Sequence, residues 1–113
     1  MLIDTKEYAS NLMKAVGELG AAAPATLAGY KALDGAAAKG GHLDAKTREL
    51  IALAVAVTTR CDGCITVHSA AAAKAGASRE ELAEALSVAI ALNAGAALVY
   101  SARAIDAFGQ QSG

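Results

Sequence analysis

Residues 45–76 read AKTRELIALAVAVTTRCDGCITVHSAAAAKAG, and they carry the clearest signals for the fold class. Alanine, leucine, glutamate, lysine and arginine favour helix, and strand signals are nearly absent. Asp44 is a suitable N-cap for the first of two helices in this stretch. The wide apolar face of that helix carries Leu50, Ile51, Leu53, Ala54 and Val57. A second helix begins near Cys61 or Asp62 and ends at Gly76, a natural C-terminal residue for a helix. The stretch therefore predicts two consecutive helices.

The rest of the chain also predicts helices, which makes about six in the whole sequence. One helix is expected over 5–19, and another opens at Pro24, a favoured first helical residue. A capping box, Ser78 to Glu81, predicts the start of a fifth helix. We expect Asn93-Ala-Gly95 to separate it from a sixth, which places Leu98, Ala102, Ile105 and Phe108 inside. The tail 109–113 is expected to fray.

Length and composition suggest one domain, 1–113, that is not a lone monomer. The chain has 113 residues, of which 55% are hydrophobic, with no Trp and one Phe. The usual hydrophobic share is about 45–50%, and a chain this short is modestly stable alone. A surplus of apolar surface on a small chain favours a homo-oligomer.

Charge and hydropathy exclude several classes of function. The net charge is −1 without blocks of like charge, which argues against nucleic acid as a partner. No apolar run approaches the 18–20 residues of a membrane span, and the N-terminus lacks the pattern of a signal peptide. The sequence thus predicts a cytoplasmic protein, in which two nearby cysteines are more often catalytic or metal-binding than structural.

Chemistry is concentrated at Cys61, Cys64 and His68, with Glu49 twelve residues before the first cysteine. On a helix, residues three and four apart are neighbours, so Cys64 lies between Cys61 and His68 on one stripe. Glu49 shares part of the apolar face of its helix and should be partly buried. It could orient the imidazole or accept a proton through water. These four residues are the candidate catalytic site.

The spacing leaves open which sulfur is the nucleophile. His68 reaches Cys64 more easily, whereas the helix N-terminus favours a thiolate at Cys61. In the reaction that we expect, a thiolate attacks a hydroperoxide and becomes a sulfenic acid, which the other cysteine converts to a Cys61–Cys64 disulfide. An external dithiol then reduces the disulfide, and no other cofactor or metal is needed.

The pattern Glu49-x11-Cys61-x2-Cys64-x3-His68 resembles the core motif of AhpD-like alkylhydroperoxidases, within the carboxymuconolactone decarboxylase superfamily. The resemblance covers about 43–108 and includes RCDGCITVHSAAAAKAGASREELAEAL, which is similar to small single-domain members. It implies an all-α, AhpD-like helical domain assembled as a homo-trimer or homo-hexamer. It also implies peroxide reduction by the dithiol.

In the family, the second cysteine attacks peroxide and the first resolves the intermediate, which implies these roles for Cys64 and Cys61. Glu49 and His68 would then form a proton relay. Larger members accept electrons from a lipoyl-bearing partner, so a lipoyl-type donor is one expectation here. They also carry a histidine just before the second cysteine, where this chain has Gly63.

Three alternative interpretations remain. Cys61, Cys64, His68 and Glu49 could hold zinc, or form a redox sensor without turnover, although zinc-binding cysteines usually occur with a second pair of ligands. A lactone decarboxylase-like enzyme could use the same fold. The cysteines could also be simply buried. Glu49 could instead pair with Lys46 or Arg60. Asp62 is most simply an N-cap, and we expect His42 to be solvated and not a ligand.

Overall fold

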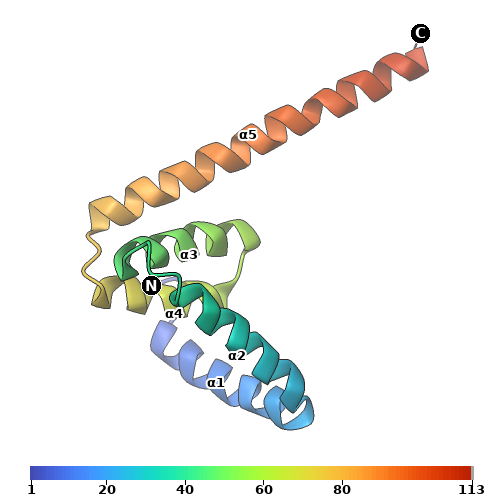
Figure 1. The fold of residues 1–113 in the computed structure, drawn as a ribbon. Coiled ribbons are helices and arrows are strands. Elements are labelled where there is room, and N and C mark those ends of the chain that lie inside the picture. The colour runs from blue at the N-terminus through green and yellow to red at the C-terminus, as the bar shows by residue number, and fades with distance from the viewer. Residues whose placement is uncertain (113) are drawn as a thin grey trace.

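The computed structural model describes residues 1–112, which form five α-helices and no strand (Figure 1). The helices are α1 (Thr5–Ala22), α2 (Pro24–Ala38), α3 (Ala45–Thr59), α4 (Asp62–Lys74) and α5 (Arg79–Ser112). Helices α3 and α4 form the body, α1 and α2 form a hairpin that contacts it, and α5 leaves the body as a long arm. The all-α prediction is confirmed, with five helices in place of about six.

The body consists of the packed pair α3 and α4. These are the two consecutive helices that were predicted for residues 45–76. Asp44 caps α3 by accepting a hydrogen bond from the amide of Thr47 at 2.8 Å, as predicted. The few buried residues of these two helices are small or aliphatic: Leu53, Ala56, Thr66 and Ala72. Small side chains let two helices approach closely, and this places one face of α3 against α4.

The helices α1 and α2 form a hairpin that meets the body through α1. Asp4 caps α1 by accepting from the amide of Glu7, and Pro24 opens α2 as its first residue. Neither helix has a fully buried residue, and α1 contacts both α2 and α4. The N-terminal half of the chain is therefore held on the body mainly where α1 crosses α4.

The predicted break at Asn93-Ala-Gly95 is wrong, because α5 runs through it without interruption. The side chain of Asn93 donates to the carbonyl of Ala89 at 2.7 Å and to Oγ1 of Thr58 at 3.0 Å, so it supports the helix and ties it to the end of α3. Gly95 has no positive φ. Nothing in the backbone demands a turn there, and the surrounding alanines and leucines favour continuing the helix.

Beyond Asn93 the arm has few contacts with its own chain. The side chains predicted to lie inside, among them Leu98, Ile105 and Phe108, are exposed, and the helix continues to Ser112 in place of a frayed tail; residue 113 lies outside the described residues. The radius of gyration is 18.5 Å, whereas a compact chain of this length has about 13 Å. The chain is thus far from compact.

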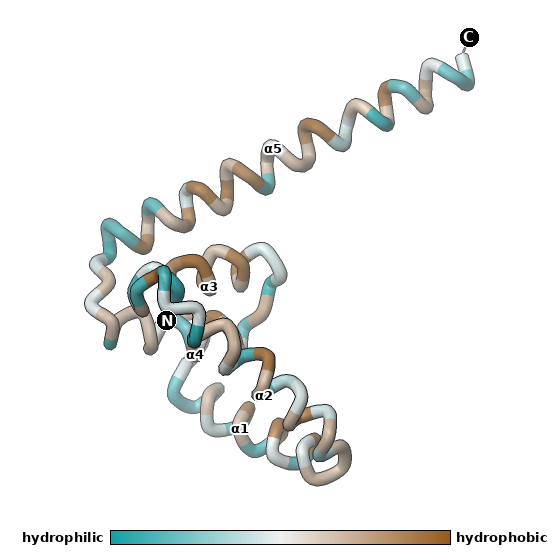
Figure 2. Tube along the Cα trace, in the orientation of Figure 1, coloured by the Kyte–Doolittle hydropathy of each residue, from teal (hydrophilic) through white to brown (hydrophobic). Residues whose placement is uncertain are grey.

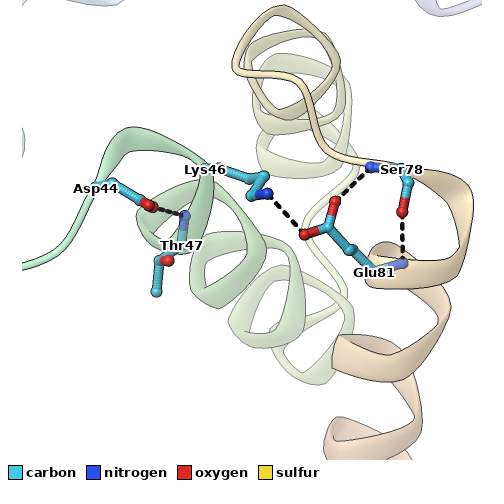
Figure 3. A network of polar contacts seen from close by, with 5 residues as sticks. All are labelled: Asp44, Lys46, Thr47, Ser78 and Glu81. Atoms are coloured by element: carbon cyan, nitrogen blue, oxygen red, sulfur yellow. Dashed lines mark hydrogen bonds and ion pairs between the residues drawn. The ribbon is translucent and has the colours of Figure 1, made fainter.

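A polar network fastens the start of α5 to the start of α3 (Figure 3). Ser78 and Glu81 form the predicted capping box, with reciprocal hydrogen bonds of 2.9 and 3.0 Å. The same Glu81 carboxylate pairs with Nζ of Lys46 at 2.7 Å. These hydrogen bonds lower the pKa of Glu81 and raise the pKa of Lys46. The network fixes where α5 begins relative to α3.

Candidate functional site: a dithiol beside a glutamate–histidine pair

The two cysteines form a disulfide at the N-terminus of α4, with their Cα atoms 5.2 Å apart. Cys61 is the N-cap of α4, and its Sγ accepts a hydrogen bond from the amide of Cys64 at 3.1 Å. The prediction that Asp62 is the N-cap is wrong, since Asp62 is the first helical residue. A sulfur at this position faces free helix amides, and these favour a thiolate once the disulfide is reduced.

A tight turn at the end of α3 places Cys61 at the N-terminus of α4. Arg60 ends α3 with φ 56° and ψ 50°, the left-handed conformation that commonly closes a helix. The amide of Cys61 then donates to the carbonyl of Ala56 at 3.0 Å, which satisfies one of the last carbonyls of α3. The dithiol therefore lies at the junction of the two best-packed helices, on a fixed backbone.

Glu49 and His68 meet across α3 and α4. Oε2 of Glu49 lies 2.6 Å from Nδ1 of His68, and the side chains are 23% and 29% exposed. When Nδ1–H donates to the carboxylate, the other ring nitrogen, Nε2, is left as the site that gains or loses a proton. The pair can therefore orient one imidazole nitrogen for proton transfer, within reach of solvent.

The fold brings together Glu49 and His68, which are nineteen positions apart in sequence. It does not bring Lys46 or His42 into the site. His68 follows Cys64 by one helical turn on α4, as the spacing predicted. Lys46 pairs with Glu81 and not with Glu49. His42, in the loop before α3, is exposed.

Gly63 lies against Leu12 of α1, where even a Cβ atom would be crowded. A Cβ atom at this position would be 2.9 Å from Cδ2 of Leu12, closer than real Cβ contacts. The Leu12 side chain would therefore have to shift to make room for any larger residue here, histidine included. The first helix thus packs directly on the turn between the cysteines.

Sequence reasoning did not find Leu12 as a neighbour of the site. Its position on the apolar face of the first helix was visible, but that pattern shows only that Leu12 packs somewhere. The hydrogen bond from Asn93 to Thr58, three residues before Cys61, was equally hidden. Both contacts depend on how separate helices dock.

The nearest groove, of about 310 Å³, lies between α3, α4 and the start of α5, and its lining is largely small or apolar: Leu53, Ser69, Ala72, Ala73, Ala77, Ser78, Arg79 and Leu82. None of the four candidate residues lines this groove. Within residues 1–112, no three His, Cys, Asp or Glu side chains are grouped closely enough to hold a metal ion. The zinc interpretation gains no support from this arrangement.

Comparison with known proteins places the chain among close relatives. The profile of the carboxymuconolactone decarboxylase family matches residues 24–107. An uncharacterised protein of Haemophilus influenzae is 60% identical, with 98% of each chain covered, and one of Cupriavidus necator is 35% identical, with 96% of each covered. The crystal structure of an apo carboxymuconolactone decarboxylase family protein from Legionella pneumophila has a TM-score of 0.73 at 38% identity, covering 94% of this chain and 95% of that one.

Proposed function

Because the chain belongs to the carboxymuconolactone decarboxylase family, and because its dithiol lies one helical turn from a Glu–His pair, we propose that it is a thiol-dependent peroxidase or disulfide oxidoreductase. The observation that supports this most directly is the Cys61–Cys64 disulfide at the start of α4. A disulfide between two cysteines on one turn can be reduced and formed again without movement of the helices that carry it.

The proposed cycle begins with the reduced dithiol. His68, held by Glu49, takes the proton of Cys64 on Nε2, and the thiolate attacks one oxygen of a small hydroperoxide. The O–O bond breaks, Cys64 becomes a sulfenic acid, and the proton from His68 completes the alcohol product. The peroxide has then gained two electrons.

The second half of the cycle restores the dithiol. Cys61, whose sulfur is near the amide of Cys64 in the disulfide, attacks the sulfenic sulfur, so that the S–S bond forms and water leaves. An external dithiol, for example of the lipoyl type, reduces the disulfide by exchange and is itself oxidised. A reducing compartment such as the cytoplasm suits this cycle.

The test uses the reduced protein with an organic hydroperoxide. Wild type should lose two hydrogens by intact mass, and Cys61→Ser should accumulate a sulfenic acid that dimedone traps at Cys64. His68→Asn and Glu49→Gln should slow the reaction by about 10²–10⁴-fold, the range for a lost general base. His42→Asn is the matched control and should leave the rate unchanged. Full peroxide turnover by Cys64→Ser would contradict the assigned roles.

A lactone decarboxylase-like activity is the second candidate, and the family match itself favours it. Such an enzyme would not need both cysteines. Lactone turnover that persists in the Cys61→Ser, Cys64→Ser double variant, together with absence of peroxide consumption in wild type, would replace the first proposal with this one.

A further inference from the structure

Arg60, which joins α3 to the dithiol, has a backbone conformation that does not suit arginine. Its φ of 56° and ψ of 50° lie in the left-handed region, and within residues 1–112 no other residue except glycine has a positive φ. Glycine, and after it asparagine, are the residues that a helix end favours in this conformation. Residues that keep such a conformation against local preference cluster at functional sites. The arginine therefore points to a role beyond closing α3.

Arg60 is exposed, and its charge has no carboxylate partner. The two ion pairs within residues 1–112 join other side chains. Asp62, the nearest acidic residue in sequence, is exposed as well and is not paired with Arg60. By contrast, Arg48 donates to a backbone carbonyl and Arg103 to a tyrosine hydroxyl. The guanidinium of Arg60 is thus available to a molecule that arrives from solvent.

This charge lies directly beside the disulfide. Cys61 follows Arg60 in the chain, and the hydrogen bond from the Cys61 amide to the carbonyl of Ala56 fixes the turn. Figure 2 shows hydrophilic segments in the connection between α3 and α4, next to the hydrophobic second half of α3. Consecutive Cα atoms are about 3.8 Å apart. A molecule that reaches either sulfur therefore comes close to Arg60.

Reduction of the disulfide brings negative charge to this turn. A thiolate of the donor attacks Sγ of Cys64, the S–S bond breaks, and Cys61 leaves as a thiolate whose sulfur accepts the amide hydrogen bond of Cys64. The second donor thiolate then attacks the mixed disulfide, so that the donor closes its own S–S bond and Cys64 leaves as a thiolate. The donor loses two electrons, and its two thiol protons end on the cysteines. A cation beside Cys61 favours both the arriving and the leaving thiolates.

We propose that Arg60 selects and positions the electron donor, and that this donor is a dithiol with a negative charge near its thiols. The guanidinium attracts that charge and holds the donor where its thiolate reaches the disulfide. The inference rests on the proposed function, because it concerns the reductive half of that cycle. Reduction of the disulfide is measured without any peroxide, so the two can be tested separately.

The test follows reduction of the oxidised protein by dihydrolipoate and by dihydrolipoamide, which have the same dithiol and differ in one carboxylate. The rates are divided by those with hydroxyethyl disulfide, an uncharged reference. Wild type should then prefer dihydrolipoate by about two- to fivefold, the effect of an exposed ion pair. Arg60→Gln should abolish the preference, and Arg60→Lys should retain most of it. Salt at about 1 M should also abolish it, because the Debye length is then only about 3 Å.

Arg79→Gln is the matched control, since it removes the same charge from another exposed arginine. Arg79 begins α5, beside the start of α3, and the 15 residues of α3 separate it from Arg60 by about 22 Å. This exceeds the Debye length of about 10 Å at 0.1 M salt, so the control should keep the wild-type preference. If circular dichroism shows that Arg60→Gln is unfolded, Arg60→Gly takes its place, because glycine suits the left-handed backbone.

Two outcomes would overturn the inference. The preference for dihydrolipoate could be the same in wild type and Arg60→Gln, or Arg79→Gln could lose it to the same extent. Neither result touches the proposed peroxidase cycle, which fails separately if a hydroperoxide does not reoxidise the reduced protein.

Discussion

At the scale of single residues, Gly63 is the point where α1 packs on the turn that carries the two cysteines. The sequence shows a glycine between two cysteines, and the structure shows that Leu12 of α1 fills the space above it. The absence of a side chain at this position therefore has a packing cause. A histidine at position 63 would require the Leu12 side chain to move from where it packs in this structure.

The contact between Gly63 and Leu12 predicts a change of sign in a double-mutant experiment. Gly63→Ala in wild type should lower the free energy of unfolding by about 1 kcal/mol, because overpacking outweighs the better helix propensity of alanine. In a Leu12→Ala background the same change should raise it by up to about 1 kcal/mol, since the clash is gone. Urea denaturation at fixed protein concentration measures both.

Gly17 provides the control for this experiment. It lies within α1 with open space around its Cα, so Gly17→Ala should be stabilising in both backgrounds. If Gly63→Ala has the same effect with and without Leu12, then α1 does not pack on the dithiol turn in solution.

The Glu49–His68 pair shows how much of the site the sequence could predict. Glu49 is on the partly buried face of its helix, and His68 is four residues after Cys64, so their separate placements followed from helical periodicity. Their contact at 2.6 Å depends on α3 and α4 lying side by side. The sequence led us to expect that Glu49 could orient the imidazole, but a one-dimensional pattern gives no distance between two helices.

At the scale of elements, the start of α5 is held on the start of α3 by a polar network whose stabilising effect depends on the ionisation of Glu81. Hydrogen bonds from Lys46 and from the amide of Ser78 lower the pKa of Glu81. A carboxylate with a lowered folded-state pKa stabilises the fold above its unfolded pKa, and this contribution is lost as the pH falls through the folded value. Lys46 has a raised pKa, so its contribution is lost only at strongly alkaline pH.

Glu81→Gln should therefore reduce the loss of stability that wild type shows as the pH falls below about 4, the ordinary range of carboxyl groups. The readout is the midpoint of urea unfolding as a function of pH. Glu80→Gln removes the same charge from the same first turn of α5 and should keep the wild-type pH dependence. An equal effect of both substitutions would mean that the Lys46 pair contributes nothing specific, as is common for exposed ion pairs.

The sequence prediction missed that α5 is one continuous helix. Asn and Gly within three residues are typical of a helix end. Here the Asn93 side chain bonds a carbonyl of its own helix and Thr58 of α3, and both bonds are compatible with helical backbone. Local propensity cannot show that a partner on another helix is available.

At the scale of the whole molecule, the disulfide should matter little for the fold. It links residues three apart within a single turn, so it restricts the unfolded chain far less than a long loop would. Reduction should lower the free energy of unfolding by no more than about 2 kcal/mol and leave the helix content unchanged. Circular dichroism and urea unfolding with and without reductant measure this, and Cys61→Ser with Cys64→Ser should match the reduced protein. Loss of helix content on reduction would show that the disulfide is needed for the fold, and would contradict its interpretation as a redox dithiol.

Local sequence was enough to predict the helical class, most helix starts and the grouping of reactive residues around Cys61–His68. These features depend on neighbours within a few residues, such as caps, helical periodicity and the CxxC spacing. Three features are visible only in the folded chain: α1 covers Gly63, Glu49 meets His68 at hydrogen-bonding distance, and α5 is one unbroken arm. These features depend on contacts between helices that are far apart in sequence, and no local pattern specifies such docking.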